Sequence, residues 1–143
     1  MVWGKGTCGT MTELLRFLVE HLGFLWEGGR YRIVDSITDG FNAMVVVESS
    51  VLRLRFTRDK AQLFLSFQPV TSRSAREEFS VDLVKRLMTG ETALLSGVLD
   101  EEYAAYVGRE LPRIEERFSP EHWSGTRDEL VCIERVRSKQ MWG

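Results

Sequence analysis

Two histidines, His21 and His122, are the side chains of this sequence best suited to acid–base or metal chemistry near neutral pH. Either role needs partners at a suitable spacing, and the sequence contains no HxxxH, HExxH or paired Cys/His motif. His122 follows Glu121, but adjacent helical residues do not face each other. We therefore expect structural roles for both histidines, with no metal site and no cofactor.

Carboxylates occur in short runs that could in principle form an acid–base pair. The runs are Glu77-Glu78, Asp100-Glu101-Glu102, Glu115-Glu116 and Asp128-Glu129. All of them fall at expected helix starts or on polar helix faces, where capping and dipole complementarity explain them. The sequence also lacks a GxSxG nucleophile elbow. No catalytic residue is assigned, and a non-enzymatic protein is favoured over an enzyme.

The composition limits the location and the partners of the chain. It has 143 residues, 43% hydrophobic and 28% charged, with a net charge of −2, which gives no reason to expect nucleic-acid binding. Cys8 and Cys132 have no motif companions, so we expect free thiols in a reducing compartment, with Cys132 inside the core. No apolar run is long enough to span a membrane, and the first residues do not form a signal peptide. We predict a cytoplasmic protein that contacts neither membranes nor nucleic acid.

The most promising polar group lies on two expected strands of alternating polarity. Same-face residues on neighbouring antiparallel strands lie about 5 Å apart, so their side chains would form one patch. The predicted binding patch consists of Arg32, Arg53, Arg55, Gln62, Phe64, Ser66 and Gln68. Arginine and aromatic residues are enriched in interface hot spots, and an outward-facing Phe64 needs cover. We expect a protein partner here, or a second copy of the chain in a homodimer; the alternative is an ordinary solvated sheet face.

The patch depends on a β-meander that alternation and turn signals predict. Strands are expected at residues 31–37, 41–48, 51–57 and 61–70, joined by connections too short for anything but antiparallel pairing. Asp39-Gly40 and Arg58-Asp59-Lys60 mark two of the turns. In the first strand, Ile33 and Ile37 are expected on one side. The face opposite the patch carries the apolar residues Leu52, Leu54, Phe56, Leu63, Leu65 and Phe67.

Helical patterns flank the meander on both sides in the sequence. An N-terminal helix is expected from a Thr12 cap to Leu22, and a second begins at Ser80 and ends at Gly90. The longest pattern begins at Asp100 and contains Pro112, where we expect a kink or break. A capping box at residues 126–129 predicts the start of the last helix.

These elements predict an α+β fold in which an N-terminal helix precedes a four-strand antiparallel meander. Three to four C-terminal helices then pack on one sheet face. Residues 1–11 are expected to be an N-terminal extension, and residues 12–143 a single domain.

Two segments carry a family resemblance: the run VLRLRFTRDKAQLFLSFQP at residues 51–69, and the segment FSPEHW that follows the capped helices. The chain resembles small actinobacterial proteins grouped with the immunity proteins of polymorphic toxin systems. The resemblance covers residues 12–138 in layout. It implies a protein that neutralises a toxin by direct binding, without chemistry of its own. No catalytic residue is carried over from this class.

A second resemblance and one further alternative stay open. The helix followed by strands from Leu14 to Val47 is similar to the start of type III secretion chaperones, but this chain continues as helix to its end. The other alternative is a small-ligand-binding protein or enzyme with its site between the sheet and the proline-containing helix. Such a site would need a closed pocket with convergent polar groups and a perturbed titratable residue.

Overall fold

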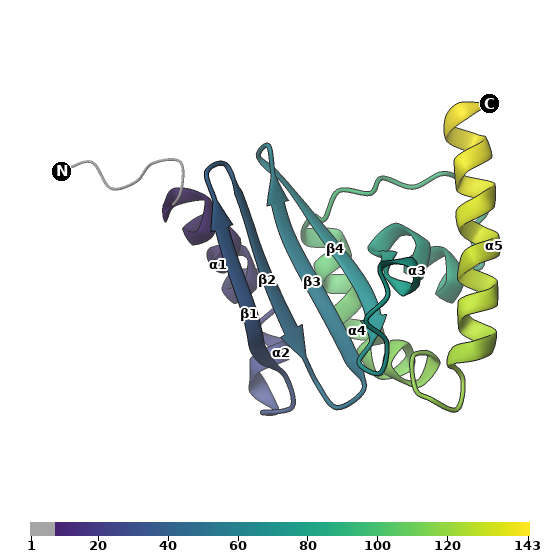
Figure 1. The fold of residues 1–143 in the computed structure, drawn as a ribbon, viewed down its shortest axis with the longest axis horizontal. Coiled ribbons are helices and arrows are strands. Elements are labelled where there is room, and N and C mark those ends of the chain that lie inside the picture. Colours follow the sequence, from purple (N-terminus) through teal and green to yellow (C-terminus); the bar gives the residue numbers. More distant parts are fainter. Residues whose placement is uncertain (1–7) are drawn as a thin grey trace.

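A computed structural model describes residues 8–143 of the chain, and Figure 1 shows its fold. Two N-terminal helices, α1 (Cys8–His21) and α2 (Phe24–Glu27), precede the strands β1 (Arg32–Asp39), β2 (Asn42–Glu48), β3 (Leu52–Asp59) and β4 (Gln62–Pro69). A 3-10 turn, η1 (Ala75–Glu77), and a short strand, β5 (Phe79–Ser80), follow. The chain ends with α3 (Val81–Thr89), α4 (Glu101–Arg117) and α5 (Trp123–Trp142). The predicted α+β fold class is confirmed.

The strands form one antiparallel sheet in sequence order, β1-β2-β3-β4-β5. The fifth strand was not predicted, because two residues are too few to show an alternating pattern. The predicted turns are present. Gly40 adopts a φ of +57° between β1 and β2, and Lys60 and Ala61 adopt φ values of +50° and +68° between β3 and β4. The latter two are unusual, since side chains with a Cβ disfavour this left-handed region.

A β-bulge interrupts the pairing of β1 with β2. Ile33 lies opposite Val47, but Asp35 lies opposite Val46, so Val34 is an extra residue. As a result Ile37 lies opposite Met44 and faces away from the side on which Ile33 lies. The prediction that Ile33 and Ile37 share one side is therefore wrong, since one extra residue reverses the alternation.

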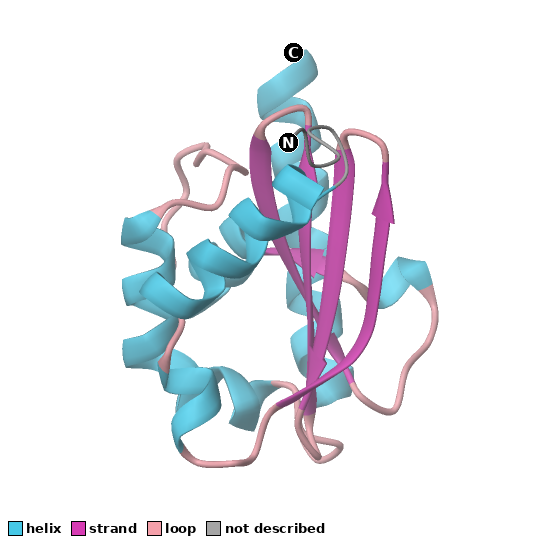
Figure 2. Ribbon diagram, turned by 90° about the vertical axis from the view of Figure 1, so that its left-hand side faces the viewer, coloured by secondary structure: helices cyan, strands magenta, loops and turns pink. Residues whose placement is uncertain are grey.

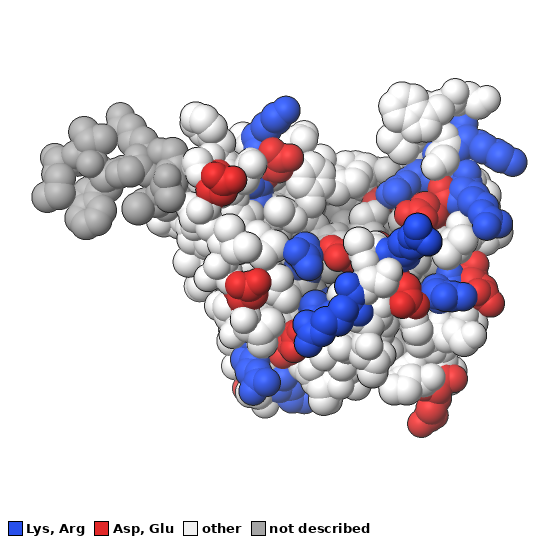
Figure 3. Space-filling view, viewed as in Figure 1, with Lys and Arg blue, Asp and Glu red and all other residues white. Residues whose placement is uncertain are grey.

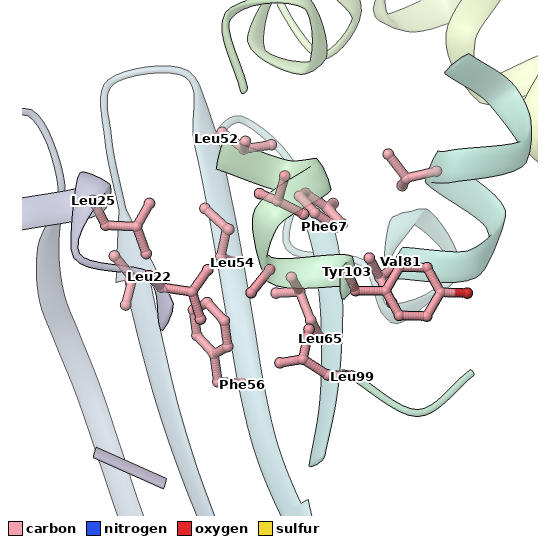
Figure 4. Packing of buried hydrophobic residues seen from close by; sticks show 14 of the residues in the cluster. Leu22, Leu25, Leu52, Leu54, Phe56, Leu65, Phe67, Val81, Leu99 and Tyr103 are labelled. Carbon is pink, nitrogen blue, oxygen red and sulfur yellow. The ribbon is translucent and has the colours of Figure 1, made fainter. Parts of the chain in front are cut away.

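The α-helices cover one face of the sheet, and the loop after β4 covers one end of the other face. Figures 1 and 2 show α1, α2 and α4 behind the strands, with α3 and α5 beside the β4–β5 edge. The core lies between the sheet and α1 and α4, and Figure 4 shows part of it around Leu54, Phe56, Leu65 and Phe67. These are the inward residues that the alternation predicted, and all four are fully or almost fully buried.

The C-terminal helices differ from the sequence-based expectations at the start of the last helix and at Cys132. Pro112 lies inside α4 without ending it, so the helix is not broken there. The last helix begins at Trp123, and Thr126 is a buried residue of its first turn, so the predicted cap at Thr126 is wrong. Cys132 is an exposed free thiol on α5 rather than a core residue. The predicted stop at Gly90 is confirmed by its φ of +77° at the end of α3.

The N-terminal helix also starts earlier than predicted. It begins at Cys8, which places Thr12 in the second turn and not at the cap. Seven residues of the predicted 1–11 extension lie outside the described part of the chain. No helix within residues 8–143 has the length and apolar character needed to cross a membrane.

Candidate functional site: the uncovered sheet face

The sheet face opposite α1 and α4 carries the predicted binding patch, and we call it the uncovered face. Strand register arranges its side chains in rows across the sheet. The first row is Arg32, Glu48, Arg53 and Gln68; the second is Asp35, Val46, Arg55 and Ser66; the third is Ile37, Met44, Thr57 and Phe64; the last includes Asp59 and Gln62. All seven predicted patch residues therefore lie on one face.

Arg53 lies on this face but is held entirely by its own chain. Only 5% of it is exposed, and its Nε donates to Glu48 Oε2 at 2.6 Å. Its Nη1 donates at 2.6 Å to both Gln68 Oε1 and the Ser72 carbonyl, and its Nη2 donates to the Val70 carbonyl at 3.2 Å. The loop after β4 thus folds back over this end of the sheet and supplies the carbonyls. Arg53 is a structural anchor and offers little surface to a partner.

Gln68 shares this role. It is 4% exposed, and its amide Nε2 donates to the Ser74 carbonyl at 2.8 Å. Its side chain therefore bridges the buried guanidinium of Arg53 to the loop. A fully satisfied buried polar network of this kind fixes one arrangement, because each unpaired group would carry a desolvation cost.

Arg55 is the more accessible arginine, with 38% of its side chain exposed. Its Nε lies 3.0 Å from Glu78 Oε1, a close charge contact whose angle does not make a hydrogen bond. Its Nη1 lies 3.0 Å from the Met44 sulfur. The Ser66 hydroxyl donates to Glu78 Oε1 at 2.5 Å, so Glu78 holds both predicted patch residues in the second row. The guanidinium is oriented but still reaches solvent.

The third row is mostly apolar and partly exposed to solvent. Ile37 is exposed, and Met44 and Phe64 are half-buried around Thr57. The α-helices lie behind the sheet or at its β4–β5 edge (Figures 1 and 2). Phe64 therefore faces outward, as the alternation predicted, with apolar neighbours across the strands. The row combines with Arg55 to give an aromatic, a thioether and a guanidinium side by side.

A shallow cavity of about 370 Å³ lies on the charged end of the face. It is lined by Val34, Asp35, Val46, Glu48, Arg53, Arg55, Gln68 and Arg73. Within the described residues the side chain of Arg73 makes no ion pair or hydrogen bond, and neither does the exposed side chain of Arg32, which lies on the same row as Glu48. Figure 3 views this face and shows basic and acidic side chains intermingled, with uncharged areas between them. The free cations here are Arg32 and Arg73, because Arg53 and Arg55 have acidic neighbours.

A hydrogen-bond chain connects this face to α5. The Ser72 hydroxyl donates to Glu77 Oε1 at 2.7 Å, and the Trp123 indole donates to Glu77 Oε2 at 2.9 Å. These two hydrogen bonds lower the pKa of Glu77, and the bond from Ser72 has the larger effect. Burial raises the pKa in part, and the nearby Arg127 lowers it by a smaller amount. Trp123 also packs on Phe118, with ring centroids 5.0 Å apart. The loop that anchors Arg53 is therefore itself fixed to the first turn of α5.

Residues suited to catalysis do not converge. His21 stacks on Phe17, and the His122 ring lies 3.1 Å from the Ser119 hydroxyl. The described residues contain no group of His, Cys, Asp or Glu that could hold a metal ion.

The space between the sheet and α4 is filled, with Phe67 and Phe118 ring centroids 6.2 Å apart within the continuous core. A cavity of about 590 Å³ at the hairpin ends has mostly apolar walls, and its Glu13 and Arg58 pair with each other.

Sequence reasoning missed several residues that complete the uncovered face. Glu48 lies on this face by the strand register. Ile37 also lies on it, because the bulge in β1 reverses the alternation before that residue. Glu78 and Arg73 belong to the segment after β4, whose path over the sheet has no local signal. Loop residues that fold back onto a strand cannot be found from alternation, because their position depends on contacts distant in sequence.

Comparisons with known proteins add no information on function. No known family matches the chain, and neither the curated proteins nor the solved structures give a match.

Proposed function

We propose that this chain is a non-enzymatic protein-binding module that contacts its partner with the uncovered face. The observation that carries the proposal is the partly exposed apolar row of Ile37, Met44 and Phe64 beside the partly exposed Arg55. Aromatic, methionine and arginine side chains are the types enriched in interface cores. A sheet presents them on a rigid backbone, which reduces the entropy lost on binding.

The network around Arg53 supports this proposal by holding the face in one conformation. Arg53, Gln68, Ser72 and Glu77 connect the sheet to the loop and to α5 through hydrogen bonds of 2.6 to 2.9 Å. The free cations Arg32 and Arg73 lie at the charged end. They favour a partner that places carboxylates there and an apolar side chain over Phe64, since such a partner would be complementary in charge.

Within this class we propose an immunity protein that neutralises a toxin by direct binding. The support is the resemblance of residues 12–138 in layout, together with a preformed binding face and filled sheet–helix space. A ligand site between the sheet and α4 is disfavoured, because Phe67, Phe118 and their neighbours occupy that space. The toxin would be encoded by the gene directly upstream, and a metabolic operon in its place would contradict the immunity role.

The test is calorimetric titration of the purified chain with the toxin domain from the upstream gene. Phe64→Ser should weaken binding by about 2 kcal/mol or more if Phe64 is a hot spot. Phe41→Ser is the matched control, because Phe41 is an exposed phenylalanine in the β1–β2 turn. Arg73→Glu should also weaken binding, with the exposed Arg135→Glu on α5 as its control. Unchanged affinity for Phe64→Ser and Arg73→Glu would show that the uncovered face is not the binding surface.

A further inference from the structure

The outer backbone edge of the sheet at β1 takes no part in the proposed function, although Arg32 and Ile37 of this strand also lie on the uncovered face. β1 is an eight-residue strand at one end of the strand order, and no described segment pairs with its outer side. Its side chains are exposed almost throughout, including the apolar Ile33 (49%), Val34 (41%) and Ile37 (52%). Among the described residues in Figure 1 no strand lies beside this edge, and the start of α1, which projects past it, lies behind the sheet. A long edge strand with apolar side chains is a template for pairing with another strand.

We infer that β1 pairs antiparallel with β1 of a second copy, which would join two sheets into one across a two-fold axis. An antiparallel contact between identical strands is isologous, so each residue and its opposite partner occur twice. Such a pairing requires that the side chains of β1 be complementary to those of a second β1 running in the opposite direction.

One register makes the strand complementary to itself. With Ser36 on the axis and Val34 remaining the bulged residue, Asp35 lies opposite Ile37 of the other copy, Ile33 opposite Thr38, and Arg32 opposite Asp39. Pairing with β2 shows that both members of each pair lie on the same face: Arg32 opposite Glu48 and Asp39 opposite Asn42 are on the uncovered face. The two sheets would therefore continue with their faces aligned, and two Arg32–Asp39 pairs would flank the axis.

The charges disfavour the two neighbouring registers that also keep the faces aligned. A shift that puts Ile37 on the axis places Asp35 opposite Asp39 of the other copy, twice. A shift in the other direction puts Asp35 opposite itself. Like charges directly opposite each other are destabilising in a sheet, whereas opposite charges stabilise it. Charge complementarity thus selects the Ser36 register.

Arg32 and Asp39 are available for this contact. Within the described residues neither forms an ion pair or a side-chain hydrogen bond, and both are exposed. The bulge at Val34 and the central Asp35 would at the same time disfavour indiscriminate strand addition, since both are devices that protect sheet edges. Edge pairing alone buries less than a standard interface, so we expect a weak dimer with a dissociation constant on the order of 10 μM.

The test is a charge-exchange series on the full chain, measured by sedimentation equilibrium in low-salt buffer. The protein concentration runs from about 1 to 200 μM, a range that brackets the expected dissociation constant. Arg32→Asp and Asp39→Arg each create two like-charge pairs, and each should raise the dissociation constant about tenfold. The double variant R32D/D39R restores two opposite-charge pairs and should dimerise as the wild type does. Arg135→Asp on α5 is the control for the change in net charge.

Two outcomes would overturn the inference. A wild-type chain that stays monomeric throughout the concentration range would exclude the dimer. A dimer in which the double variant is as weak as the single variants would exclude the Ser36 register. The toxin-binding test uses Phe64 and Arg73, which lie on β4 and the following loop, so failure of either proposal is recognised separately.

Discussion

Arg53 provides the sharpest test of how the uncovered face is built. Its guanidinium makes four hydrogen bonds, to Glu48, Gln68 and the carbonyls of Ser72 and Val70, and it is 5% exposed. We predict that Arg53→Met destabilises the fold strongly although methionine preserves much of the packing of the arginine stem. The substitution removes one member of a buried ion pair and leaves the Glu48 carboxylate without its cation.

The expected magnitude follows from the surroundings of Glu48. Breaking a buried ion pair by removing one partner costs about 3–5 kcal/mol. The Glu48 side chain is 17% exposed and lines the shallow cavity, so water can reach it in part. We therefore expect a loss near the lower limit, about 3 kcal/mol, which corresponds to a fall in Tm of about 6–12 °C for a domain of this size.

The assay is urea unfolding at pH 7, followed by circular dichroism and by tryptophan fluorescence. Trp123 donates to Glu77, which binds the same loop whose carbonyls accept from Arg53, so fluorescence should report the loosened loop. Arg55→Met is the matched control two residues along the same strand. Because Arg55 is partly exposed and contacts Glu78 through a solvent-accessible pair, its loss should cost about 1 kcal/mol or less. Equal small losses for both variants would refute the structural role of Arg53.

Two further predictions concern the β3–β4 turn and Glu77. The left-handed φ values of Lys60 and Ala61 suit an Asn-Gly turn, so K60N/A61G should raise the free energy of unfolding by about 1 kcal/mol. As a control, Ala105→Gly on the exposed side of α4 should lower the free energy of unfolding by about as much. Equal stability of K60N/A61G and the wild type, with Ala105→Gly still destabilised, would show that the turn is unstrained in solution. The lowered pKa of Glu77 contributes stability that is complete above the usual carboxyl pKa of about 4.3 and is lost as pH falls through the lower folded value. Glu77→Gln should therefore be less stable than the wild type at pH 7 in urea unfolding, and the difference should shrink below about pH 4, with exposed Glu121→Gln as the charge control. A difference that stays constant with pH would contradict this reasoning.

The sequence by itself determined which side chains of β3 and β4 share a sheet face. Leu52, Leu54 and Phe56 alternate with Arg53 and Arg55, and the two-residue period of a strand is a local property that survives any tertiary arrangement. Gly40 and Gly90 likewise marked a turn and a helix end, because only the local φ is involved there. These signals sufficed for the α+β class and for the seven predicted residues of the uncovered face.

The tertiary structure decided which residues of that face are free. Arg53 and Arg55 look alike in sequence, but the loop from Val70 to Ser74 folds back and buries only Arg53. The bulge at Val34 moves Ile37 onto the uncovered face, and packing of Trp123 on Phe118 places the start of α5 ahead of the Thr126 signal. Burial depends on segments that meet across long sequence separations, so alternation can define a face but cannot show what covers it.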